Sequence, residues 1–186
     1  MQADAIIRRE LLTLLRGGHA HMSPEDVLAD FPLEQVNARP PNSPYSCWHI
    51  LEHMRIAQWD ILEFIRNPGH VSPEYPEGYR PRPEARTDAA GWQSSVERLM
   101  EDLAALEAMV RDTRTDLFAP IPHAPDYTIF REILTAADHM AYHTGELAMM
   151  RQVLKLWPKG SEYLTGWEEQ GGCGFRFVNG SGCHPP

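Results

Sequence analysis

Four of the nine histidines fall into two pairs with a spacing of four residues: His49 with His53, and His139 with His143. In a helix this spacing places both imidazoles on one face, about one turn apart, where both can bind the same metal ion. A single pair arises easily by chance, and the alternative is a set of ordinary histidines at a polar helix surface. Two pairs, each in a stretch with helical periodicity, are harder to attribute to chance, and both a metal site and ordinary surface histidines stay open at this point.

Helical geometry narrows the choice of ligands. The apolar stripe of the later stretch is centred near Met140, and at about 100° per residue His139 and His143 both fall on its flank. In the earlier stretch His53 borders the apolar stripe, whereas His49 lies further towards the polar side. A three-histidine site would therefore draw on His53, His139 and His143, with His49 as a nearby reserve. Three protein ligands with an open position are typical of catalytic metals, because a closed structural site needs a fourth strong ligand.

Two acidic residues have the spacing to support these ligands. Glu146 and Asp60 could each accept a hydrogen bond from a ligand imidazole, which is how metal-binding histidines are commonly oriented. The alternative for both is an acidic side chain in solvent. The histidines at positions 19, 21, 70 and 123 fall in loops or at helix ends, where we expect ordinary polar residues.

Four amphipathic helices must position these groups. Apolar spacings of three and four residues, with proline and glycine at the boundaries, predict helices over about 3–16, 46–65, 88–111 and 128–156. Ser23-Pro24 begins a further short helix. Residues 68–86 hold five prolines and two glycines, which predicts a long connection. We therefore predict the fold class as all-α, a four-helix bundle over residues 1–157.

The C-terminal extension, residues 158–186, is expected to be rich in loops and either packed on the bundle or flexible. It holds the one candidate strand, residues 175–178. Its Cys173, Cys183 and His184 could form a second metal site, although their spacing matches no zinc motif. An odd number of cysteines without a signal peptide favours reduced thiols, and Cys47 is expected to be a small buried apolar residue.

Composition limits the partners. A net charge of -9, with 17 basic residues spread along the chain, argues against nucleic acid and against an anionic membrane surface. No apolar run approaches the roughly 18 residues that a membrane span needs. The N-terminus opens with an acidic residue and lacks the basic and apolar regions of a signal peptide, so we expect a cytoplasmic protein. Its partner is expected to be a small-molecule substrate, and an exposed apolar face would allow a homodimer.

Two segments resemble a known family. Residues 48–54, Trp-His-Ile-Leu-Glu-His-Met, and residues 138–147, Asp-His-Met-Ala-Tyr-His-Thr-Gly-Glu-Leu, with Arg151 after a short apolar run, resemble the DinB/YfiT-like family. The resemblance covers residues 1–157. It implies a four-helix bundle with one divalent ion, zinc or nickel first and iron or manganese next. The implied ligands are one histidine on the second long helix, His53, and two on the fourth, His139 and His143.

The resemblance also suggests a function. Related bundles include transferases that use low-molecular-weight thiols such as bacillithiol or mycothiol, and a thiol-dependent maleylpyruvate isomerase. The implied function is a metal-dependent transferase that joins such a thiol to a small electrophile, with Glu146 or Tyr142 as candidates for proton transfer. The alternatives are a metal-dependent hydrolase at the same site, a non-enzymatic metal-binding or stress-response protein, or a helical interaction protein without activity. An enzyme requires an open coordination position facing a pocket.

Overall fold

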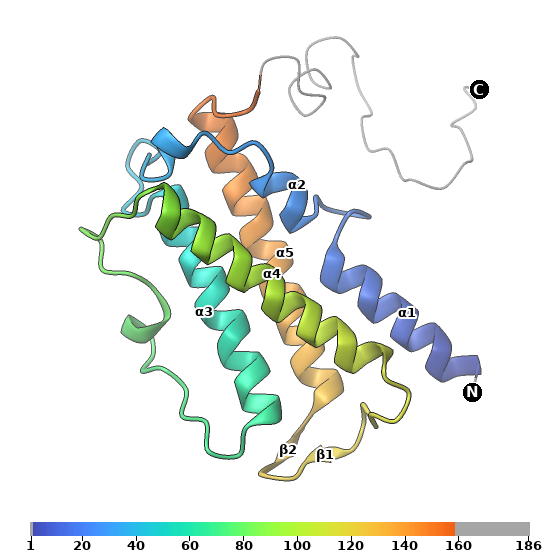
Figure 1. Cartoon of the computed structure of the whole chain (residues 1–186). Helices are drawn as coiled ribbons and strands as arrows, with labels where there is room; N and C mark the ends of the chain where they lie inside the picture. The colour runs from blue at the N-terminus through green and yellow to red at the C-terminus, as the bar shows by residue number, and fades with distance from the viewer. Residues whose placement is uncertain (1, 159–186) are drawn as a thin grey trace, which may run out of the picture.

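The computed structural model describes residues 2–158 of the chain (Figure 1). Within them, four long helices form the bundle: α1 (Gln2–Arg16), α3 (Cys47–Arg66), α4 (Ala89–Arg111) and α5 (Ile129–Val153). The short elements are α2 (Pro24–Leu28), the 3-10 turns Leu33–Gln35 and Glu77–Tyr79, and the strands β1 (Pro120–Ile121) and β2 (Ala124–Thr128). The predicted all-α four-helix bundle is confirmed. Cys173, Cys183, His184 and the candidate strand 175–178 lie outside the described residues.

Capping side chains explain where the helices begin. Ser46, Asp88 and Thr128 each precede a long helix, and each accepts a hydrogen bond from the backbone N–H three residues later. Ser23 does the same for α2, with Pro24 in the first turn. Such caps satisfy backbone donors that have no partner inside the helix. The predicted starts near 46, 88 and 128 therefore agree with the structure.

The last helix ends earlier than predicted. α5 stops at Val153, three residues before the predicted end, because Lys155 adopts the left-handed conformation with φ 58°. The N–H of Leu156 then reaches back to the carbonyl of Arg151 at 2.8 Å, and that of Lys155 to Gln152 at 3.1 Å. This pattern closes a helix end by the Schellman motif, which usually carries glycine rather than lysine.

A short antiparallel hairpin was not predicted. β1 and β2 pair between α4 and α5, with Ile121 opposite Ala124 and Pro120 opposite Thr128. Three prolines in this segment indicated a break, and proline weakens any strand pattern because it has no N–H to donate. The expectation of no strand outside the tail is therefore wrong, although only Ile121 of β1 is buried.

The connection between α3 and α4, residues 67–88, runs back along α3, so that α3 and α4 point in the same direction (Figure 1). We call this segment the strap. Hydrogen bonds fix its course: His70 near its start contacts Asp60, and Arg82 near its end contacts His49, one turn into α3. α1 and α5 run the opposite way. The strap thus covers a face of α3 that would otherwise lie in solvent.

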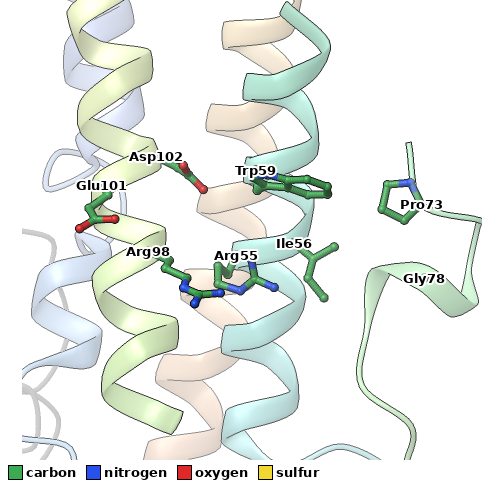
Figure 2. Close-up of a pocket in the computed structure, with 8 residues that line it drawn as sticks. All are labelled: Arg55, Ile56, Trp59, Pro73, Gly78, Arg98, Glu101 and Asp102. Atoms are coloured by element: carbon green, nitrogen blue, oxygen red, sulfur yellow. The ribbon is translucent and has the colours of Figure 1, made fainter. Parts of the chain in front are cut away.

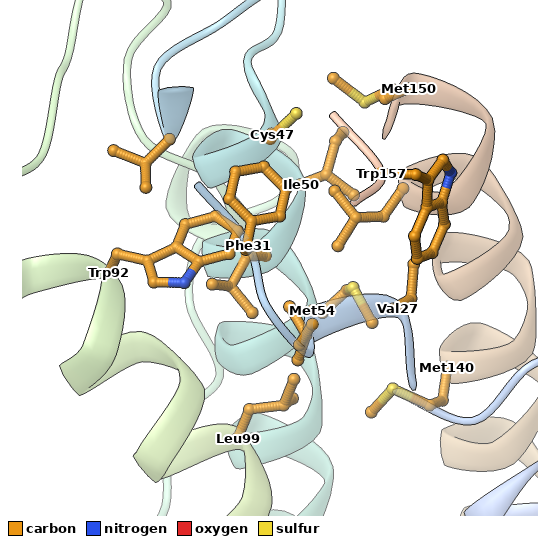
Figure 3. Close-up of a cluster of buried hydrophobic side chains, with 14 residues drawn as sticks. Val27, Phe31, Cys47, Ile50, Met54, Trp92, Leu99, Met140, Met150 and Trp157 are labelled. Carbon is orange, nitrogen blue, oxygen red and sulfur yellow. The ribbon is translucent and has the colours of Figure 1, made fainter. Parts of the chain in front are cut away.

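Apolar side chains fill the bundle in two clusters, one towards each end. The first joins α2, α3, α4 and α5 around Phe31, Met54, Trp92 and Met140 (Figure 3). Cys47 belongs to it, fully buried as predicted, and burial raises the pKa of its thiol to about 12. Among residues 2–158, none of the helices combines the length and the apolar character that crossing a membrane would require.

Candidate metal centre

Three histidines meet between two antiparallel helices. His53 of α3 faces His139 and His143 of α5, with ring centroids 4.4–4.9 Å apart. One potential ligand atom from each residue lies within 4.8 Å of the other two. All three side chains are partly buried. The structure therefore brings together the three residues that the sequence analysis selected as ligands.

Hydrogen bonds orient two of the three rings. Nδ1 of His53 lies 2.7 Å from the carbonyl oxygen of Tyr79, and Nδ1 of His143 lies 2.7 Å from Oε2 of Glu146. Because a carbonyl or a carboxylate only accepts, both Nδ1 atoms carry a proton, and in the neutral ring Nε2 therefore keeps its lone pair. The predicted supporting role of Glu146 thus has a geometric basis.

The spacing of the ring nitrogens fits a shared ion. Nε2 of His139 and Nε2 of His53 are 3.1 Å apart. Two nitrogens bound tetrahedrally to one zinc ion at about 2.0–2.1 Å would be separated by about 3.3 Å. The lone pairs therefore converge at roughly the distance that coordination requires, and the donor set suits a borderline metal such as zinc or nickel.

The surroundings keep two of the three imidazoles, those of His53 and His139, neutral. Burial, together with the neighbouring His143 and His53, lowers the pKa of His139 to about 3. Burial also lowers the pKa of His53, against the hydrogen bond to the Tyr79 carbonyl, which raises it. At neutral pH both rings are then in the neutral form, with one nitrogen free to bind a metal.

Asp60 does not contact the three histidines. Its carboxylate accepts hydrogen bonds from Nε2 of His70 at 2.7 Å and from the hydroxyl of Tyr79 at 2.6 Å. Burial and Asp60 together raise the pKa of Tyr79 to about 12. The expectation that Asp60 orients a ligand directly is wrong, and so is the alternative of an acid in solvent. Asp60 instead holds Tyr79, whose carbonyl orients His53, so its effect on the site is indirect.

His49 is not a reserve ligand. It is only 1% exposed, and its two ring nitrogens lie 2.6 Å from Oγ of Ser46 and 3.0 Å from the carbonyl of Arg82. Helical periodicity predicts that it lies towards the polar side of α3. That side is covered by the strap, and helical periodicity carries no information about such a cover. His70, expected to be an ordinary polar residue, also joins α3 to the strap through Asp60.

A cavity of about 430 Å³ opens onto the three histidines, between α3, α5 and the strap. The cavity is also lined by Tyr45, His49, Ile50, Tyr75, Arg80, Tyr142 and Glu146. Tyr142 is 71% exposed and Tyr75 is 80% exposed, which places both at the rim. Tyr142 could be predicted from the sequence, but Arg80 and Tyr45 could not, because both lie in or beside proline-rich segments without periodicity.

A second cavity, of about 540 Å³, lies between α3, α4 and the strap (Figure 2). Asp102 projects from α4 towards α3, whereas the ring of Trp59 extends from α3 towards Pro73 of the strap. Burial raises the pKa of Asp102. The residues of this cavity carry both signs of charge, and its Arg55 already pairs with Glu52 at 2.7 Å. No histidine lines it, so within the described residues the metal-binding geometry belongs to the first cavity.

Comparison with known proteins places this site in a family. No curated protein and no solved structure matches the chain. The family model of the DinB superfamily matches residues 20–147, a range that includes all three histidines and Glu146. Since this match spans more than half of the 186 residues and the fold is the expected helical bundle, the chain belongs to the DinB superfamily.

Proposed function

We propose that His53, His139 and His143 hold one divalent ion, and that the chain is a transferase joining a low-molecular-weight thiol to a small electrophile. The observation that carries this proposal is the cavity of about 430 Å³ beside the three histidines. A structural or sensed ion needs a closed shell, whereas among residues 2–158 the cluster offers three ligands and no fourth. An open position facing a cavity is the arrangement that an enzyme requires.

A divalent ion at this site would supply Lewis acidity, which lowers the pKa of a thiol so that thiolate is present at neutral pH. Proton transfer and substrate contact are assigned to side chains of the protein. Glu146 uses Oε2 for His143, and its other oxygen, Oε1, has no hydrogen bond within residues 2–158 and can take the thiol proton. Tyr142, at the rim, is assigned to substrate contact instead of proton transfer.

The proposed reaction is a nucleophilic substitution. A bond forms between the thiol sulfur and the electrophilic carbon, the bond from that carbon to its leaving group breaks, and the leaving group departs with its electron pair. The thiol proton passes to Glu146 and then to solvent. The cavity contributes by holding both reactants next to one another, which alone can supply a large part of the rate.

The test uses the zinc-loaded chain with 2-mercaptoethanol and 1-chloro-2,4-dinitrobenzene as probes. We expect a thioether product and free chloride, at a rate about 100-fold or more above the mixture without protein, because the site holds both reactants together. His19→Ala, which removes an exposed histidine from the loop after α1, should leave this rate unchanged. Hydrolysis of 4-nitrophenyl acetate without any thiol-dependent reaction would contradict the transferase and indicate a hydrolase at the same histidines.

A further inference from the structure

Arg80 is the cationic side chain of the cavity that contains the three histidines. The strap places it there, directly after Tyr79, whose hydroxyl is held by Asp60 and whose carbonyl is held by His53. A residue next to two anchored contacts has little freedom to move its backbone. Arg80 is therefore fixed in the wall of the cavity by the same hydrogen bonds that orient His53.

The guanidinium of Arg80 has N–H donors that its contacts within the described residues do not use. Nη1 donates to the hydroxyl of Tyr45 at 2.6 Å, and the group lies over the Tyr45 ring at 4.9 Å. Nε is buried and has no hydrogen-bond partner in the described part of the chain. A guanidinium carries five N–H donors, so one neutral hydroxyl leaves most of its capacity unused.

No acidic side chain among residues 2–158 forms an ion pair with Arg80. The acidic residue that shares the cavity, Glu146, is hydrogen-bonded to His143 instead. A partly buried cation without a counter-ion is unfavourable unless a ligand supplies the negative charge. Arginine also matches the planar, two-oxygen geometry of a carboxylate better than lysine does.

We propose that Arg80 binds a carboxylate of the ligand that occupies this cavity, while the reacting end of that ligand lies at the three histidines. This inference rests on the proposed function, which identifies the reacting end as a thiol or an electrophile. The carboxylate is part of one of these two reactants. Tyr45 orients the guanidinium, and the exposed tyrosines at the rim contact the body of the ligand. Arg80 is thus a residue that determines substrate specificity.

The experiment compares two matched pairs of probes by calorimetry on the zinc-loaded chain. One pair is 3-mercaptopropionate with 3-mercaptopropionamide, and the other is 4-chloro-3-nitrobenzoate with 4-chloro-3-nitrobenzamide. In at least one pair, the wild type should bind the carboxylate about 10-fold or more tightly than the amide, as a charge-assisted hydrogen bond predicts. The pair that shows the preference identifies whether the thiol or the electrophile carries the carboxylate.

Arg80→Met should abolish the preference while amide binding persists, and Arg80→Lys should retain part of it. The matched control is Arg82→Met, which removes the same charge two residues away from an exposed position. A preference that survives in Arg80→Met would show that the carboxylate binds the zinc, and would overturn the proposal. Absence of a preference in both wild-type pairs would overturn it too. If neither thiol binds but the benzoate preference depends on Arg80, the thiol function fails and the anion site stands.

Discussion

Replacing His139 by alanine is expected to lower the affinity of the chain for zinc or nickel by more than about 100-fold. His139 is one of three converging imidazoles, and its Nε2 lies 3.1 Å from that of His53. Loss of a residue that only orients a ligand typically reduces metal affinity about 10- to 100-fold, and loss of the ligand itself must exceed this. Titration against a competing chelator of known affinity measures the change.

Two further variants provide reference values for the loss of metal affinity in His139→Ala. Glu146→Gln keeps an acceptor near Nδ1 of His143 but removes its charge, so we expect an intermediate loss of about 10- to 100-fold. His19→Ala should bind the ion as the wild type does. If His139→Ala retained wild-type affinity, the ion would be bound elsewhere, and the three-histidine assignment would be wrong.

Replacing Arg151 by methionine is expected to lower the free energy of unfolding by about 3–5 kcal/mol. The Arg151 side chain is fully buried on α5, and its guanidinium lies 3.9 Å from the centroid of the Trp157 ring. Four backbone carbonyls accept its hydrogen bonds: those of Val27, Ala29, Asp30 and Leu156. Methionine fills much of the space but leaves these acceptors without a donor, and each such buried group costs about 1–3 kcal/mol.

Denaturant unfolding of the metal-free chain measures this change. The control is Arg9→Met, at an exposed ion pair with Glu10 on α1, which should alter stability by no more than about 0.5 kcal/mol. Arg151→Lys should fall between the two, because an ammonium keeps the charge but cannot reach all of the carbonyls. A methionine variant as stable as the wild type would show that water replaces the guanidinium, and that Arg151 does not hold α2 against α5.

The helices could be predicted because their signals are local. A capping side chain such as Ser46 or Thr128 and an apolar stripe of constant period lie within one stretch of sequence. The end of α5 was misjudged because the left-handed conformation of Lys155 is unusual for a residue with a side chain. The hairpin at Pro120–Thr128 was missed because its strands are too short to show alternation.

The residues of the candidate site also fall into those that could be predicted from the sequence and those that could not. His53, His139 and His143 could be found because each lies on a regular helix, where spacing fixes direction. Arg80 could not, because its position depends on the path of the strap, and that path is set by hydrogen bonds between distant residues. The same cover buries His49 and gives Asp60 its partners, so both were assigned the wrong surroundings.

In the proposed site, three imidazoles bind one ion and leave one coordination position open to the cavity. X-ray absorption spectroscopy of the zinc-loaded chain tests this arrangement most directly. We expect one zinc ion per chain, with three imidazole nitrogens at about 2.0–2.1 Å and the remaining position filled by an oxygen of solvent. A shell with fewer imidazoles, or with sulfur at about 2.3 Å, would contradict it, because sulfur ligation would assign the ion to cysteines instead of His53, His139 and His143.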